Sequence, residues 1–123
     1  MSGQIDTVVN ELFSKDSNIG ALAIIGLDGT VKGLFGQWSI DGPTFINAIN
    51  NKESSITVQG VRYSVLTSTE TSFIATNIKG MGYLVGASIP DKAWVVIYLG
   101  PDGDPKLALK ELFEAVGKLS KLL

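Results

Sequence analysis

The sequence contains neither cysteine nor histidine. The absence of cysteine excludes disulfide bonds and thiolate chemistry, and the absence of both residues excludes zinc sites built from them. Histidine is also the side chain best suited to proton transfer near neutral pH, so a serine or threonine nucleophile would need an unusual base. Both absences argue against an enzyme, and no cofactor is expected.

The sequence also lacks an excess of positive charge, and it lacks long apolar runs. The net charge is −2 and the pI is about 5.0, so the chain has no basic field that would hold nucleic acid. No apolar run reaches the ~20 residues that span a bilayer. The first residues also lack the basic and apolar regions of a signal peptide. We therefore expect a cytoplasmic protein that does not bind nucleic acid.

The length and composition fit one folded domain. The chain has 123 residues, of which 45% are hydrophobic and 18% are charged. A chain of this size buries roughly two thirds of its unfolded surface, which is enough for a hydrophobic core. Residues 1–123 are therefore expected to form a single domain.

Apolar residues recur at helical spacing near both ends of the chain. They predict one amphipathic helix over residues 4–15 and a second that begins at Pro105, with Asp104 as its N-cap. The inward face of the second helix is expected to carry Leu109, Leu112, Phe113, Val116, Leu119 and Leu123. A short helix is expected from Pro43 to about Asn50, capped by Asp41.

Short apolar runs separated by turn residues predict the strands between these helices. The expected strands cover residues 21–26, 31–35, two strands within 55–68, then 72–79, 82–88 and 93–99. Each amphipathic terminal helix needs a sheet face on which to bury its apolar stripe. The fold class is therefore expected to be α+β: an antiparallel sheet of six to seven strands, with the N- and C-terminal helices on one face and the short helix on the other.

The glycines at 80, 82 and 86 form a pattern close to, but different from, a dinucleotide-binding fingerprint. The spacing is one residue too long, and a strand rather than a helix follows, so no helix N-terminus would face a phosphate. A glycine-bearing β-turn explains these residues better. In the same way, Asp102 and Asp104 fit turn and cap positions better than a calcium site, because the other oxygen ligands are missing.

Four stretches of the sequence match short motifs of one known protein family. Gly60, Arg62, Tyr63 and Val65 match a glycine–basic–tyrosine–valine strand, and Lys79-Gly80 matches a hairpin corner. The run "VVIY" (95–98) matches an apolar strand that ends in tyrosine, and "ALAIIGLDGTV" matches the first hairpin of the family. Together these stretches resemble the profilin family, and the short length and reduced aromatic set make the chain similar to archaeal (Asgard-type) profilins in particular.

The resemblance implies a protein that binds monomeric actin and regulates its polymerisation by occupying one end of the actin monomer. Such a protein would be a monomer of the cytoplasm and cytoskeleton. By position, the implied actin-binding residues are Val65, Thr67, Lys79, Tyr83, Val85, Lys106, Lys110 and Glu114. Strand alternation is expected to place Val65 and Thr67 on one face, and Tyr83 and Val85 on one face of the next strand.

Two further ligands of the family are weighed against the sequence. A polyproline groove needs aromatic faces, but the corresponding positions hold Gln4, Thr7, Lys32 and Lys118, which argues against polyproline binding. Phosphoinositide lipids would depend on local lysines such as Lys106, Lys110, Lys118 and Lys121, and only weak binding is expected from a chain with this pI.

The alternative interpretation is a Roadblock-type domain. Such domains have a similar order of helices and strands, and they act as dimeric scaffolds or regulators of small GTPases. The additional strand "ITVQ" (56–59) and the lysine–glycine corner favour the profilin interpretation. Fold alone would not decide between the two.

Overall fold

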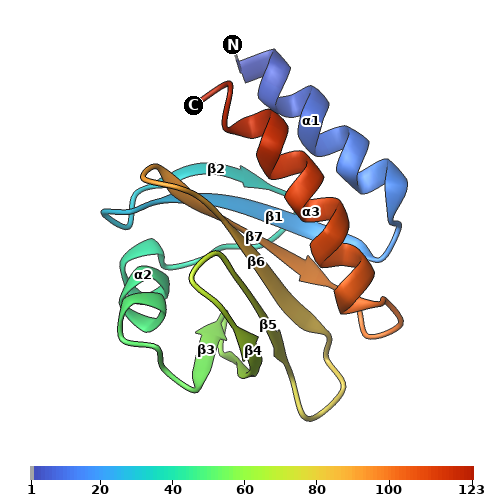
Figure 1. Cartoon of the computed structure of the whole chain (residues 1–123). Helices are drawn as coiled ribbons and strands as arrows, with labels where there is room; N and C mark the ends of the chain where they lie inside the picture. The colour runs from blue at the N-terminus through green and yellow to red at the C-terminus, as the bar shows by residue number, and fades with distance from the viewer. Residues whose placement is uncertain (1) are drawn as a thin grey trace.

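The computed structural model describes residues 2–123 of the chain. Its elements are α1 (Ser2–Lys15), β1 (Ile19–Gly26), β2 (Val31–Phe35), α2 (Gly42–Asn50), β3 (Ser55–Val58), β4 (Val61–Ser68), β5 (Ser72–Thr76), β6 (Tyr83–Ile89), β7 (Ala93–Leu99) and α3 (Pro105–Leu119). Within residues 2–123, all seven strands join one antiparallel sheet in the order β2-β1-β7-β6-β5-β4-β3 (Figure 1). The α+β prediction is therefore confirmed.

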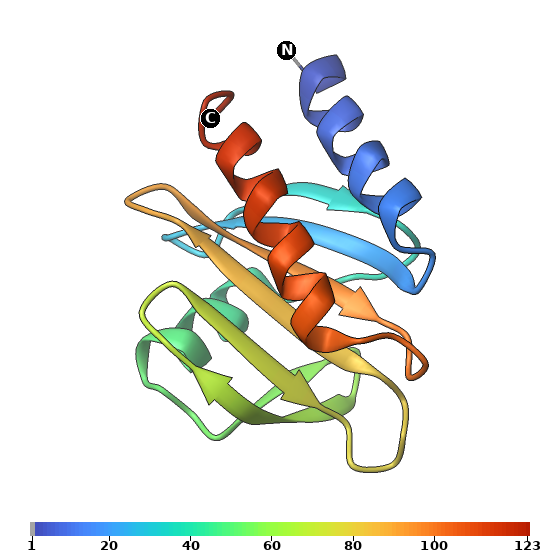
Figure 2. The same cartoon turned by 45° about the vertical axis from the view of Figure 1, so that its right-hand side comes forward.

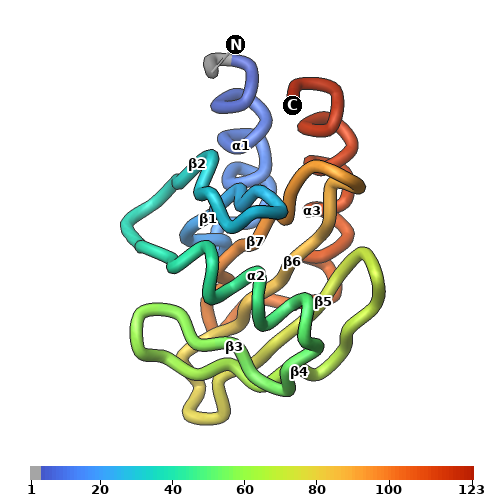
Figure 3. The backbone as a smooth tube through the Cα atoms, turned by 90° about the vertical axis from the view of Figure 1, so that its left-hand side faces the viewer, coloured from blue at the N-terminus to red at the C-terminus, as the bar shows by residue number. Residues whose placement is uncertain are grey.

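The sheet has a hydrophobic core on each face. The terminal helices α1 and α3 cover one face, where Leu12 and Leu112 pack with strand residues such as Val85. Helix α2 lies on the opposite face, where Phe45 packs with residues such as Leu84. Figures 1 and 3 show this arrangement, with α1 and α3 side by side and antiparallel on one side of the sheet and α2 on the other. The predicted distribution of helices over the two faces is confirmed.

Helix starts follow the local chemistry of the chain. The side chain of Asp41 accepts a hydrogen bond from the backbone N–H of Thr44, and Asp104 accepts one from the N–H of Lys106 at 3.0 Å. Both aspartates therefore satisfy donors that the first helical turn leaves free. In both α2 and α3 a proline follows within the first two helical positions, where its missing N–H costs nothing.

Three aromatic rings form a row beneath α2. The ring centroid of Phe73 lies 5.9 Å from that of Phe45 and 5.9 Å from that of Trp94, and all three rings are buried. Gly86 on β6 lies opposite Phe73 across the β5–β6 ladder. The space that a side chain at position 86 would need is filled by the ring of Phe73.

Two local features differ from the sequence prediction. Strand β5 ends at Thr76 rather than near residue 79, because the side chain of Asn77 organises a turn instead of continuing the ladder. The pairing of β4 with β5 also shifts register between Val65 and Thr67, so Leu66 is an extra residue on β4. Such a bulge breaks the two-residue alternation of faces.

Candidate functional site

Part of the sheet on the side of the terminal helices is left uncovered. Helix α3 packs over β6 and against α1, while β5 and β4 extend beyond it (Figure 2). On this uncovered area Ser64, Thr76 and Tyr83 lie opposite one another on three neighbouring strands. Tyr83 is half-buried, because its ring packs against the core beneath the terminal helices. The area is therefore a polar strip that ends in an aromatic ring beside α3.

The flank of α3 that borders this strip carries two lysines and a phenylalanine. Lys106, Lys110 and Phe113 are spaced i, i+4 and i+7, so they form one stripe along the helix. All three are exposed, and Phe113 leaves 42% of its surface accessible. An exposed phenylalanine beside a half-buried tyrosine gives the surface an aromatic centre.

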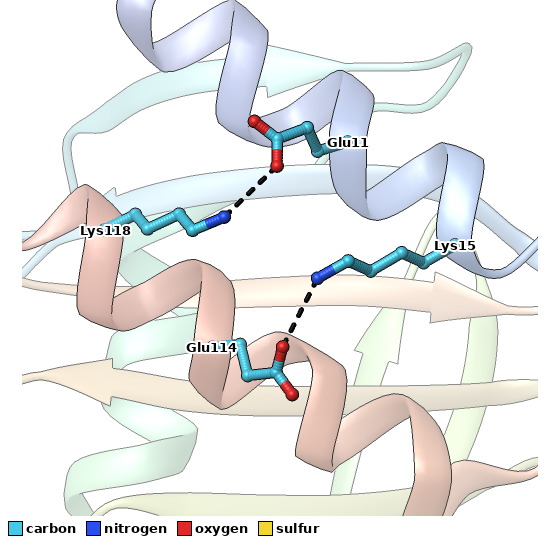
Figure 4. Close-up of polar contacts among 4 residues, drawn as sticks. All are labelled: Glu11, Lys15, Glu114 and Lys118. Atoms are coloured by element: carbon cyan, nitrogen blue, oxygen red, sulfur yellow. Dashed lines mark hydrogen bonds and ion pairs between the residues drawn. The ribbon is translucent and has the colours of Figure 1, made fainter.

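The other flank of α3 faces α1. Lys15 forms an ion pair with Glu114 at 3.3 Å, and Lys118 forms one with Glu11 at 3.1 Å (Figure 4). The buried face of α3 sets its rotation against the sheet. The two ion pairs lie on the flank beside α1, so the stripe with Phe113 points away from α1. We call the resulting surface the β4–β6/α3 face. Its residues are Arg62, Ser64, Thr67, Thr76, Tyr83, Lys106, Lys110 and Phe113.

Positive charge gathers on and beside this face. Arg62, Lys79, Lys106 and Lys110 are exposed, and none of them forms an ion pair with any residue from 4 to 123. The whole chain nevertheless carries a net charge of −2. Unpaired cations concentrated on one side of an acidic protein favour a partner with negative potential.

The seam between α1 and α3 contains a carboxyl group in an unusual setting. Burial raises the pKa of Glu111, and the negative charge of nearby Asp16 raises it further. One oxygen of Glu111, Oε1, is buried, and a hydrogen bond with the side chain of Asp16 also favours the protonated form. This group lies on the α1 side of the helix, away from the β4–β6/α3 face.

Five of the predicted site residues lie on or beside this face. Thr67 is exposed on β4, and its partner Ile74 belongs to the core under the terminal helices, which places both on that side of the sheet. Tyr83, Lys106 and Lys110 border the same surface, and Lys79 is exposed at the tip of the β5–β6 turn.

Three predicted site residues do not join them. Val65 lies on the α2 face, because the bulge at Leu66 separates it from Thr67; the prediction that alternation keeps them together is wrong. Val85 does share a face with Tyr83 but is 0% exposed beneath α3, so it supports the surface without forming part of it. Glu114 is turned towards α1 by its ion pair with Lys15.

The sequence prediction omitted four residues of the face. Arg62 and Ser64 could have been found by alternation, since the aromatic Tyr63 between them points to the opposite side and is buried. Thr76 gives no distinctive signal. Phe113 was expected to face inward, but it lies off the stripe of buried residues on α3 and is exposed.

The described part of the chain also limits other kinds of site. Among its residues, no group of three or more acidic side chains is arranged to hold a metal ion. None of its helices combines the length and hydrophobicity needed to cross a bilayer.

Comparison with known proteins identifies close relatives. No family model matches the chain. It is 39% identical to Odin profilin from Odinarchaeota yellowstonii (strain LCB_4) over 119 residues, which cover 97% of this chain and 98% of that protein. Its structure superposes on the profilin chain in the solved complex of LokiProfilin2 with rabbit actin with a TM-score of 0.88, at 27% identity and complete coverage of both chains.

The Roadblock alternative shares only the general architecture. A Roadblock/LC7 domain from Streptomyces avermitillis aligns with a TM-score of 0.59 and 14% identity, over 94% of this chain and 97% of that one. Identity at this level reflects the fold alone. The sequence match to Odin profilin along almost the whole length of both proteins is decisive, and the chain belongs to the profilin family.

Proposed function

We propose that this profilin binds monomeric actin through the β4–β6/α3 face and regulates polymerisation by occupying one end of the monomer. The observation that carries the proposal is the likeness, over the full length of both chains, to LokiProfilin2, which was solved in complex with rabbit actin. The protein acts by binding alone, as a single domain and a monomer in the cytoplasm, without catalysing a reaction.

The surface has the composition expected of a protein interface. Specific interfaces combine an aromatic or apolar centre with a polar, charged rim. Here Tyr83 and Phe113 supply the centre, and Lys106, Lys110 and Arg62 surround it. Val85 supports this centre from beneath and keeps β6 packed against α3. The unpaired lysines would speed the encounter with an acidic partner more than they would slow its release.

Sedimentation equilibrium of the protein alone and mixed with monomeric actin tests the proposal. A monomer that forms a one-to-one complex with actin is the expected result. A stable homodimer that is indifferent to actin would overturn it and favour the Roadblock alternative. The actin should include one from an archaeon, so that a mismatch with a eukaryotic actin is not taken for a lack of function.

A pair of charge reversals then tests the position of the interface. Lys110→Glu lies on the β4–β6/α3 face, whereas Lys52→Glu makes the same charge change at an exposed site beyond α2. Lys110→Glu is expected to slow association with actin about fivefold at low salt. Lys52→Glu should leave the rate unchanged. Equal effects of the two substitutions would place the interface elsewhere.

A further inference from the structure

The β5–β6 turn, residues 77–82, exposes two large apolar side chains. Ile78 is 85% exposed, more than any other large hydrophobic residue in the described part of the chain, and Met81 is 50% exposed. Single exposed apolar residues are common on protein surfaces. Two of them in one six-residue turn, beside a proposed interface, form an apolar tip that water solvates poorly.

The turn holds this tip rigidly. Asn77 is buried; its side-chain amide donates to the carbonyl oxygen of Arg62 at 2.9 Å, and its oxygen accepts from the backbone N–H groups of Lys79 and Met81 at 2.9 and 3.2 Å. The hydroxyl of Tyr98 also donates to the carbonyl oxygen of Met81 at 2.7 Å. These bonds fix the turn before any partner arrives, which lowers the entropy lost on binding.

Glycine is required for this path of the chain. Gly82 has a φ of +112°, and a Cβ there would lie 2.5 Å from the carbonyl oxygen of Leu99 and 2.8 Å from the hydroxyl of Tyr98. The turn is therefore seated closely against β7. The seated backbone keeps the side chains of Ile78 and Met81 directed to solvent rather than folded onto the sheet.

The tip is continuous with the β4–β6/α3 face. A groove runs between the turn and the start of β4, and Arg62, Ser64, Ile78 and Met81 are among the residues that line it. Arg62 and Ser64 also belong to the β4–β6/α3 face. A partner that covers that face would therefore also contact the groove and the tip. The positively charged Arg62 and Lys79 line this groove together with Ile78 and Met81.

We infer that the β5–β6 turn anchors the proposed complex, with Ile78 and Met81 inserted into an apolar recess of the actin monomer. This role rests on the proposed function, and it assigns association and dissociation to different residues of the turn. Lys79 acts during encounter, because an exposed charge steers association. Ile78 acts after contact, because burial of a rigidly held apolar side chain slows dissociation.

Binding kinetics on immobilised monomeric actin test whether the apolar residues control dissociation and Lys79 controls association. Ile78→Ser and Met81→Ser are each expected to raise the dissociation rate about tenfold and to leave the association rate nearly unchanged. Leu27→Ser is the matched control, since Leu27 is 48% exposed in the β1–β2 turn, outside the proposed interface. Ile78→Val should behave like the wild type. Lys79→Glu should show the opposite pattern, slower association at low salt with an unchanged dissociation rate.

The outcomes separate this inference from the proposed function. If the wild type binds actin and Ile78→Ser dissociates no faster than Leu27→Ser, the turn is not the anchor, although actin binding stands. If the wild type does not bind actin, both proposals fail. Flotation with vesicles of phosphatidylcholine and phosphatidylserine tests whether the tip inserts into a lipid bilayer instead of actin. Vesicle binding that Ile78→Ser abolishes, with actin binding unaffected, would assign the tip to a bilayer and overturn the inference.

Discussion

The substitution Gly86→Ala should lower the melting temperature of the protein strongly. An alanine Cβ at this position would lie 2.7 Å from Cδ2 and from Cζ of Phe73 and closer still to its Cε2. The ring cannot move away, because Phe73 is 1% exposed and sits between Phe45 and Trp94, with both centroid distances 5.9 Å. Forcing a methyl group into such a core costs up to about 3 kcal/mol.

The expected shift in melting temperature follows from the size of the domain. Unfolding gains about 2.1 cal/mol/K per residue, or about 0.26 kcal/mol/K for the 123 residues of this chain. A loss of about 3 kcal/mol therefore lowers the Tm by about 12 °C. Actin binding should persist well below the new Tm, because Gly86 faces α2 and not the proposed interface. Thermal unfolding followed by circular dichroism measures the shift.

A double-mutant cycle isolates the cause. Phe73→Leu removes the ring, so adding Gly86→Ala to it should cost little more, whereas independent effects would add. Gly117→Ala is the control, because a methyl group there would meet no other side chain within 4 Å and alanine favours an exposed helix by about 1 kcal/mol. A Tm for Gly86→Ala within about 3 °C of the wild type, or additive effects in the cycle, would refute the reasoning.

Three further expectations concern the terminal helices. The pKa of Glu111 is higher in the folded protein than in the unfolded chain, so the folded protein keeps a proton on this group at pH values where the unfolded chain has lost it. The free energy of unfolding therefore falls as the pH rises above the ordinary pKa of glutamate. Glu111→Gln should melt at a higher temperature than the wild type at pH 7 and at the same temperature near pH 4. Lys92 donates to the backbone oxygens of Ser120 and Leu123 at 3.1 and 2.8 Å. Lys92→Met should therefore lower the free energy of unfolding by about 1 kcal/mol and speed amide exchange at residues 119–123; unchanged exchange there would count against a role for these bonds. A proline-rich peptide should leave the NMR signals of the α1–α3 seam unmoved, since ion pairs rather than aromatic faces bridge it; saturable shifts in that seam would contradict this expectation.

The sequence predicted most elements correctly because their signals are local. Asp41 and Asp104 act on groups two or three residues away, and turn residues separate the apolar runs that became strands. The placement of α1 and α3 on one face and α2 on the other followed from the need of each apolar stripe for a sheet surface. These inferences required no knowledge of distant contacts.

The predicted side-chain placements that the structure contradicts lie where distant contacts decide. The segment around Leu66 contains no glycine or proline that would signal a bulge, so alternation wrongly kept Val65 and Thr67 together. Alternation placed Val85 on the correct face but could not reveal that α3 covers it. Helical spacing likewise could not show that the flank of α3 with Phe113 borders the part of β4 and β5 that α1 and α3 leave exposed.

The antiparallel arrangement of α1 and α3 bears on how the chain can be connected. The start of α1 and the C-terminal end that follows α3 lie near each other at one end of the molecule, and the β5–β6 turn lies at the other (Figures 1 and 2). A short linker could join them, and the chain could be opened instead at an exposed turn such as Gln59-Gly60. The order of strands in the sheet would be the same after such a circular permutation. Because the two ends lie close together, the same sheet and helix packing could form from a chain that starts at a different residue.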